Sequence, residues 1–230
     1  GALWAILQPF LLMLVFTIFF SKALNIDSAA LPYPIFVYTG LILWNVFSVG
    51  ITNSGNSLVN NANMIKKIFF PRLLLPLSSI LSTLVDFLMT FVLFIGLMIY
   101  YDIYPNLLQL VIVLPTALLI TLFTTFGLGA FLSALNVKYR DFRYVIPFMV
   151  QVLLFLTPVI YPLTIVPNEF AQQILALNPM SGAIALLRGS FTGEYPSMMI
   201  LTQSLVISLL LFFSGVFYFH KTEYYFADLA

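Results

Sequence analysis

The chain has 230 residues, of which 62% are hydrophobic and 7% are charged, with a formal net charge of +1. A soluble domain carries about 25% charged residues, so this composition excludes a soluble globular enzyme and predicts a protein surrounded mostly by lipid. The small net charge offers no basic field for phosphates, which excludes a nucleic-acid-binding protein. With no Cys and one His, disulfide frameworks, thiol catalysis and Cys or His metal clusters are excluded as well.

The first apolar run, residues 2–20, is the first expected membrane span. The chain opens with Gly1 instead of Met, and we expect that residues before Gly1 are missing or were removed. The run has no basic segment before it and no small-residue cleavage site after it, so we do not interpret it as a signal peptide.

Five further apolar runs follow, separated by charged residues or by Pro and Asn clusters. A helix needs about 20 apolar residues to cross the hydrocarbon core, and only a helix satisfies its backbone within one segment there. We therefore expect an all-α integral membrane protein, a single transmembrane domain over residues 1–230. The six expected spans are residues 2–20, 34–59, 73–101, 107–135, 145–160 and 196–219.

The distribution of Lys and Arg predicts the orientation. With six spans, both chain ends lie on one side together with the 60–72 and 136–144 loops. Seven basic residues fall on that side: Lys66, Lys67, Arg72, Lys138, Arg140, Arg143 and Lys221. The other side has two, Lys22 and Arg188. Because basic loops stay inside, we expect both termini in the cytoplasm.

A polar stripe runs along the second span. Its members, which make five steps over 18 residues and so follow the helical period of about 3.6, are Asn45, Ser48, Thr52, Asn56, Asn60 and Asn63. A helix that faces lipid does not carry such a stripe. We expect Asn45, Thr52 and Asn56 to line a channel, and the alternative is that the stripe forms hydrogen bonds between helices.

Asp86 lies near the middle of the third span. A charge at the bilayer centre costs about 2.5–3.5 kcal/mol on insertion scales. The polar residues that share its helical face are Ser79, Ser82, Thr83 and Thr90. Asp86 is therefore expected to face the protein interior, either as part of the packing or as part of a transport pathway.

The fifth span, residues 145–160, rises only about 24 Å at 1.5 Å per residue. The apolar segment 161–195 after it contains two helix starts. Asn168 is placed to cap a helix over 170–177, and Asn178 precedes a Pro at the first position of a second helix. We expect this second helix to stop at Gly189.

These two short helices predict a re-entrant hairpin that completes the fifth span from the outer side. Irregular backbone at membrane depth is tolerated only against protein or a wet cavity, so the hairpin is expected to line the exit, with Asn178 and Arg188 among its lining residues. The alternative is an amphipathic hairpin that lies on the membrane surface.

No motif supplies energy or catalysis. The stretch closest to a phosphate-binding loop, residues 50–57, has Asn56 where the lysine is required. Because no nucleophile–base pair or metal motif stands out, the chain is not expected to be an enzyme or to hold a cofactor, and a partner must supply the work.

Several short motifs occur together: the 135–141 stretch with its Tyr-Arg-Asp, the Thr-Pro-Val-Ile-Tyr-Pro of 157–162, Asn178-Pro179, Arg188 and the 223–228 tail. Together they resemble the membrane subunit of a type-2 ABC exporter of the polysaccharide, O-antigen and teichoic-acid branch. The resemblance covers essentially the whole chain. In this family, an amphipathic cytoplasmic interface helix precedes the first span. The given sequence departs from the family here, because this helix is missing or abbreviated at its start.

The resemblance implies a homodimer around a central channel in a bacterial inner membrane, with two ATP-binding cassette subunits that bind ATP and Mg. The implied cargo is a glycan on a polyprenyl-diphosphate carrier. Lys66, Lys67 and Arg72 would belong to the coupling helix that contacts the ATPase, with Arg140 and Asp141 close by. These cations are also placed to attract the carrier's diphosphate.

Three alternatives stay open. An exporter of this fold could carry teichoic acid, small lipids or drugs, because the spans do not reveal the cargo. A secondary transporter would need ion sites and usually internal repeats, and a membrane enzyme would need a catalytic constellation. The sequence shows neither.

Overall fold

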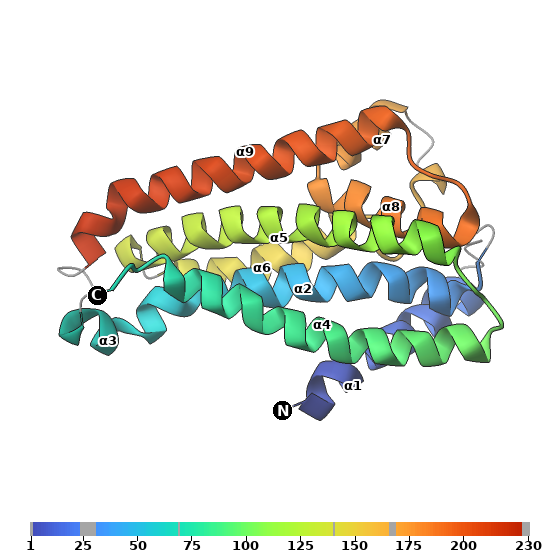
Figure 1. Ribbon diagram of the computed structural model, residues 1–230, viewed down its shortest axis with the longest axis horizontal. Helices are drawn as coiled ribbons and strands as arrows, with labels where there is room; N and C mark the ends of the chain where they lie inside the picture. The colour runs from blue at the N-terminus through green and yellow to red at the C-terminus, as the bar shows by residue number, and fades with distance from the viewer. Residues whose placement is uncertain (1, 24–30, 69, 140, 166–168, 227–230) are drawn as a thin grey trace.

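The computed structural model describes residues 2–23, 31–68, 70–139, 141–165 and 169–226. Within these ranges every regular element is a helix and no strand occurs. The long helices run roughly side by side and form an elongated bundle (Figure 1). The all-α membrane fold expected from the apolar runs is thus confirmed.

Among the described residues, five helices are long and apolar enough to cross a membrane, by length and composition, and a sixth apolar helix is shorter. The longer helices are α1 (Ala2–Phe16), α2 (Tyr33–Asn60), α4 (Leu74–Tyr100), α5 (Leu107–Lys138), α6 (Phe142–Leu156), α8 (Pro179–Thr192) and α9 (Met198–Thr222). The short elements are the π-helix η1 (Thr17–Ala23), α3 (Ala62–Lys67), η2 (Leu163–Ile165), α7 (Glu169–Ala176) and η3 (Glu223–Tyr225).

Local capping explains why several helices start and stop where the sequence predicts. The side chain of Asn106 accepts hydrogen bonds from the N–H groups of Leu108 and Gln109 at the start of α5, which satisfies donors that have no partner within the helix. At the end of α4, Asp102 adopts a left-handed conformation with φ of 54°. The N–H of Ile103 then bonds to Met98 O at 3.0 Å, which closes the helix.

The fifth expected span, 145–160, is wrong at its end. Helix α6 stops at Leu156, and Thr157 is extended, with φ of −98° and ψ of 137°. The physical reason is Pro158, because a proline disfavours the helical conformation of the residue before it. With 15 residues, α6 rises only about 22 Å.

Both helices of the expected hairpin are present, but the predicted stop of the second one is wrong. Helix α8 runs through Gly189 and ends at Gly193, whose φ of 76° is left-handed and whose N–H bonds to Gly189 O. Asn178 caps α8 as expected, since its side chain accepts from the N–H of Met180. The other expected cap, Asn168, lies outside the described residues.

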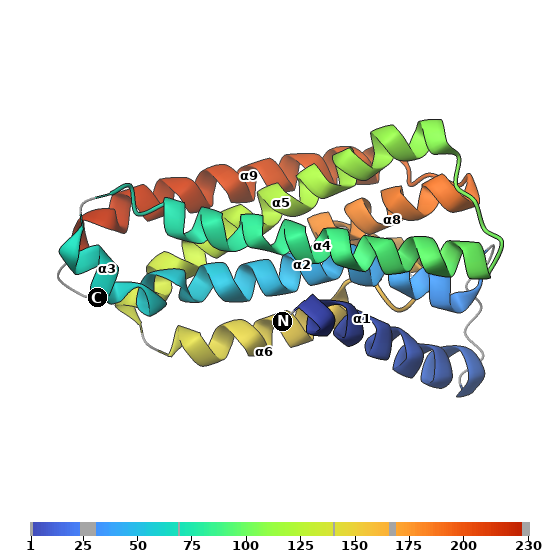
Figure 2. The ribbon, with the colours of Figure 1, turned by 60° about the horizontal axis from the view of Figure 1, so that its bottom comes forward.

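Helix α2 lies in the middle of the bundle, where it packs against α1, α4, α5, α6 and α8 (Figures 1 and 2). We call the two ends of the bundle the α3 end and the α8 end. Nearly all of α8 is buried, against α2, α5 and α9. A hairpin lying on the membrane surface therefore does not describe α8, although Gln173 and Ile174 of α7 are exposed.

Candidate functional site

A basic surface forms at the α3 end. We define it by the three cations Lys66, Lys67 and Arg72. Together with Ile65, Ile68 and Phe70 these residues line a hollow of about 320 Å³. Ile65 is buried and anchors the short helix, whereas Lys66 and Lys67 are exposed.

No described carboxylate forms an ion pair with a cation of the basic surface, although the Glu223 carboxylate lies beside Arg72 and accepts a hydrogen bond from its backbone N–H. Within the described ranges, an ion pair with a distance below 4.0 Å joins His220 Nδ1 to Glu223 Oε2 at 3.2 Å. No ion pair between described residues involves Lys66, Lys67 or Arg72. Unpaired cations on an exposed concave surface attract an anionic group, such as a carboxylate or a phosphate.

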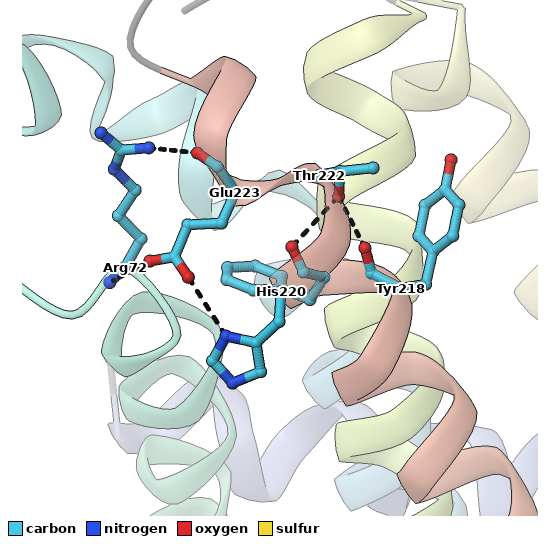
Figure 3. Close-up of polar contacts among 6 residues, drawn as sticks. Arg72, Tyr218, His220, Thr222 and Glu223 are labelled. Carbon is cyan, nitrogen blue, oxygen red and sulfur yellow. Dashed lines mark hydrogen bonds and ion pairs between the residues drawn. The ribbon is translucent and has the colours of Figure 1, made fainter.

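The end of the chain braces this surface, as Figure 3 shows. The guanidinium of Arg72 donates from Nη1 to the backbone oxygen of Glu223, and the N–H of Arg72 donates to Glu223 Oε1 at 3.4 Å. The second carboxylate oxygen of Glu223 contacts His220. The side chain of Arg72 is therefore oriented by a segment 151 residues away in the sequence.

A second hydrophobic cluster supports the basic surface from inside, separate from the main core. Its buried members come from α2, α3, α4, α5, α9 and the tail: Leu58, Ile65, Leu75, Ala130, Ala134, Val137, Phe219 and Phe226. The rings of Phe219 and Phe226 meet edge to face, with centroids 5.2 Å apart. Ile65 of α3 thus belongs to one buried cluster with residues of five other segments.

The second basic loop of the sequence prediction lies between α5 and α6. Asp141 is exposed, and its carbonyl accepts hydrogen bonds from the N–H groups of Tyr144 and Val145 at the start of α6. Lys138 lies over the ring of Tyr139 at 5.2 Å. Arg140, the other residue expected here, lies outside the described residues.

A groove with polar side chains opens between α1, α2 and α6. Its volume is about 280 Å³, and its polar lining residues are Gln8, Asn45, Ser48 and Gln151. We call it the amide groove, because three of these four side chains are carboxamides. Each carboxamide both donates and accepts hydrogen bonds, so the groove suits a polar, uncharged ligand with many hydroxyl groups.

The accessible part of α2 coincides with the polar stripe. From residue 33 to residue 52, the residues of α2 that are not buried are Pro34, Asn45, Ser48, Val49 and Thr52. Thr52 donates to Ser48 O at 2.8 Å and Asn56 donates to Thr52 O at 2.8 Å, so these side chains turn back onto their own helix. The stripe is thus the open side of an otherwise enclosed helix.

Asp86 is half-buried on α4 and is not among the residues that line the amide groove. On its helical face, Thr83 and Thr90 are buried and Ser82 is exposed. The structure shows no hydrogen bond or ion pair from the Asp86 carboxylate to any described residue. Asp86 therefore lies at the edge of the buried face of α4.

Arg188 is buried, not exposed to a channel. Its side chain is 8% exposed and donates to the backbone oxygens of Phe36, Pro158 and Val159 at 3.0, 2.7 and 2.6 Å. The guanidinium also stacks on the ring of Phe36 at 3.5 Å. Arg188 thus joins α8 to the start of α2 and to the segment after α6.

Asn178 makes a second connection between the hairpin and that segment. Besides capping α8, it donates from Nδ2 to Thr157 Oγ1 at 2.7 Å.

In the part of the chain that the structure describes, no group of three or more His, Cys, Asp or Glu side chains could hold a metal ion.

Comparison with known proteins agrees with this architecture. Residues 1–192 match the family described as ABC-2 type transporter. The chain belongs to the ABC-2 transporter family. It is therefore a multi-pass membrane permease, a type of subunit that works with ATP-binding subunits, and not itself an enzyme.

Curated relatives of this ABC-2 permease include export and transport proteins of three bacteria. An O-antigen export system permease of Klebsiella pneumoniae is 28% identical over all of this chain and 87% of the relative. One of Myxococcus xanthus is 32% identical over 78% of this chain and 68% of the relative. A polysialic acid transport protein of Escherichia coli is 27% identical over 86% of this chain and 76% of the relative.

Sequence reasoning missed three contributors to these sites in the ABC-2 permease. Gln8 and Gln151 join Asn45 in the amide groove, and a carboxamide inside an otherwise apolar span was a usable signal for both. The partnership of Glu223 with Arg72 had no such signal, because it depends on how the segment before α4 and the end of α9 meet in space.

Proposed function

We propose that this chain is the transmembrane subunit of an ATP-driven exporter that moves a polyprenyl-diphosphate-linked polysaccharide from the cytoplasm across a bacterial inner membrane. The observation that carries the proposal is the match to O-antigen export permeases along the whole chain. The polysialic acid transport relative supports a polysaccharide as the class of cargo.

In this proposal two copies of the chain and two ATP-binding cassette subunits, which bind ATP and Mg, form the working exporter. The α3 end lies in the cytoplasm together with both termini. Lys66, Lys67 and Arg72 contact acidic groups of the ATPase, with Arg140 and Asp141 nearby. Support comes from the concave basic surface, whose cations form no ion pair with a described carboxylate, and from its bracing by the tail.

The amide groove is half of the proposed glycan path, and the same groove of a second copy completes it. Carboxamides exchange hydrogen bonds with sugar hydroxyls as they do with water, so Asn45 and Gln151 let a hydrated chain pass without a fixed site. Thr52 and Asn56 continue the path toward the cytoplasm along the same stripe. Large exposed aromatic residues on α6, Phe148 at 67% and Phe155 at 59%, give the second copy an apolar surface beside the groove.

The remaining site residues act at the margins of this path. Asp86 borders the path from α4, and Asn178 and Arg188 hold the hairpin at the outer exit. Because Arg188 has carbonyl partners on three sides, its role in this proposal is to position the exit.

Cysteine scanning tests the path, and the natural chain has no Cys to interfere. Asn45→Cys, Ser48→Cys and Thr52→Cys should react with a membrane-impermeant maleimide in the assembled exporter. Val92→Cys is the control, since Val92 is 69% exposed but faces lipid in this proposal. Equal protection of all four thiols would contradict a water-filled path at α2.

The triple variant Lys66→Ala, Lys67→Ala, Arg72→Ala tests the basic surface. We expect export to be lost together with co-purification of the ATPase. If the ATPase still binds and export is lost, the cations act on the carrier's diphosphate instead. Retained export together with retained binding would refute both roles.

A further inference from the structure

Asn136 bridges two helices at the α3 end of the bundle. It lies near the end of α5 and is 2% exposed. Its Nδ2 donates to Gly55 O and to Asn56 Oδ1 of α2, each at 3.0 Å. A buried amide that lost these acceptors would remain unsatisfied, so the bridge holds α5 and α2 in one register.

The bridge stands where three helices converge. A Cβ atom on Gly55 would lie 2.7 Å from Ile146 Cδ1 of α6 and 3.6 Å from Leu132 Cβ of α5. Ile146 is fully buried. A shift of the backbone at Gly55 therefore moves against both α5 and α6 at once.

Further along the same contact, α2 and α5 are pressed together over small residues. A Cβ atom on Gly50 would lie 2.5 Å from Thr125 Cγ2, and one on Gly129 would lie 2.4 Å from Ser54 Oγ. Such close approach leaves little room for sliding, because close-packed interiors have low compressibility and transmit strain. On the side of the bridge toward the α8 end, α2 and α5 are thus packed together as one unit.

Between the bridge and α3, the helical backbone is interrupted. Helix α2 ends at Asn60, and Asn61 has a non-helical backbone with φ of −107° and ψ of 20° before α3 begins. Along the chain, Asn56 lies between this interruption at Asn61 and Ser48, the nearest lining residue of the amide groove. Along the chain, a push on α3 reaches the groove through the last turn of α2, and a bend in that turn would absorb the push.

We propose that Asn136 is a positioning residue that fastens the last turn of α2 to α5, so that a displacement of α3 moves the wall of the amide groove. This inference rests on the proposed function. Without the bridge, the displacement is absorbed between Asn56 and Asn61. ATP is then hydrolysed by the partner, but the groove does not open.

The test is a pair of thiols, Asn56→Cys with Asn136→Cys, in a chain that has no other Cys. The complex with its ATPase is reconstituted with lipid-linked glycan extracted from the producing cells. With free thiols, we expect glycan export per ATP hydrolysed to fall at least fivefold, while ATPase binding and hydrolysis stay within twofold of the parent. A short bis-thiosulfonate that bridges the thiols should restore the ratio.

Three results would overturn the proposal: an unchanged ratio with free thiols, a bridged protein that stays uncoupled, or thiols that the reagent fails to bridge. Failure of the parent complex itself to export would instead count against the proposed function.

Two conservative variants separate positioning from packing. Asn53→Asp, at an exposed position on the same helix, leaves the Asn136 bridge intact and should stay within twofold of the parent ratio of export to hydrolysis. Asn136→Asp removes the donor and should lower the ratio at least fivefold. Equal ratios in the two variants would contradict the proposal, since both changes conserve side-chain size.

Discussion

The guanidinium of Arg188 is surrounded by backbone oxygens instead of carboxylates. Its planar set of donors reaches Phe36 O, Pro158 O and Val159 O at the same time, a geometry that fits Arg and not Lys. Gly40 makes room for it, because a Cβ atom there would lie 2.9 Å from Arg188 Nη2. One side chain thus fixes three segments at the α8 end.

Arg188→Lys should destabilise the protein even though the charge is kept. An ammonium group cannot bond all three carbonyls, and each buried carbonyl left without a partner costs about 1–3 kcal/mol. We expect a clear fall in the midpoint of thermal unfolding of the purified protein, and a larger fall for Arg188→Met. Arg143→Met, at an exposed position, is the control, and an equal fall in that variant would contradict this role of Arg188.

Helices α5 and α9 meet backbone to backbone. A Cβ atom on Gly215 would lie 2.0 Å from Gly127 O, and one on Gly127 would lie 2.3 Å from Leu211 O. Small residues permit this approach between membrane helices. Gly127 and Gly215 thus serve close packing between the fourth and the last span, and nothing in the sequence pairs these two positions.

Gly215→Ala should force α9 away from α5, because the atom it would meet belongs to the backbone and cannot turn aside. We expect lower thermal stability and less protein in the membrane. Gly96→Ala on α4 is the matched control, since a Cβ atom there meets nothing within 4 Å, and Ala exceeds Gly in helix propensity by about 1 kcal/mol. If Gly215→Ala is as well tolerated as Gly96→Ala, the contact does not hold the two helices together.

The segment after α9, which includes η3 and Phe226, packs against the α3 end of the bundle. Phe226 is 2% exposed in the second hydrophobic cluster, so Phe226→Ala should remove about 3–5 kcal/mol from that cluster and loosen the 60–72 loop. The expected result is weaker co-purification of the ATPase. Phe217→Ala, where the ring is 70% exposed on α9, should leave co-purification unchanged, and equal loss in both variants would contradict the bracing role of the tail.

Much of the helical layout was predictable because it depends on local chemistry. Apolar run lengths, Pro and Asn place α2, α4 and α5 within about three residues of their expected bounds. The prediction failed where a neighbour changes a residue's preference. Thr157 belongs to an apolar run but precedes a proline, and Gly189 lies inside α8, where a Cβ atom would meet the ring of Tyr195 at 2.6 Å.

The candidate site was predictable only in part, because a site is a property of tertiary contacts. The polar stripe announced that α2 has a special face, and Asn45 does line the amide groove. No sequence pattern around Asn136 predicts its contact with Asn56, which is 80 residues away in the chain. Likewise, the sequence presented Arg188 as a lining residue, and the folded chain places it among buried carbonyls.

At the scale of the whole molecule, the proposed sites form a line. The basic surface at the α3 end, the second hydrophobic cluster, the Asn136 bridge and the amide groove follow one another along α2. This order gives a displacement at α3 a continuous packed route to the groove between α1, α2 and α6.

One measurement tests the central claim most directly. The chain and its ATP-binding partner are reconstituted into sealed vesicles with lipid-linked glycan, and glycan that becomes accessible on the far side is followed after ATP addition. We expect transfer that requires ATP and stops when the partner's ATP site is inactivated. Transfer by the chain alone, driven by an ion gradient and indifferent to the partner, would contradict the claim.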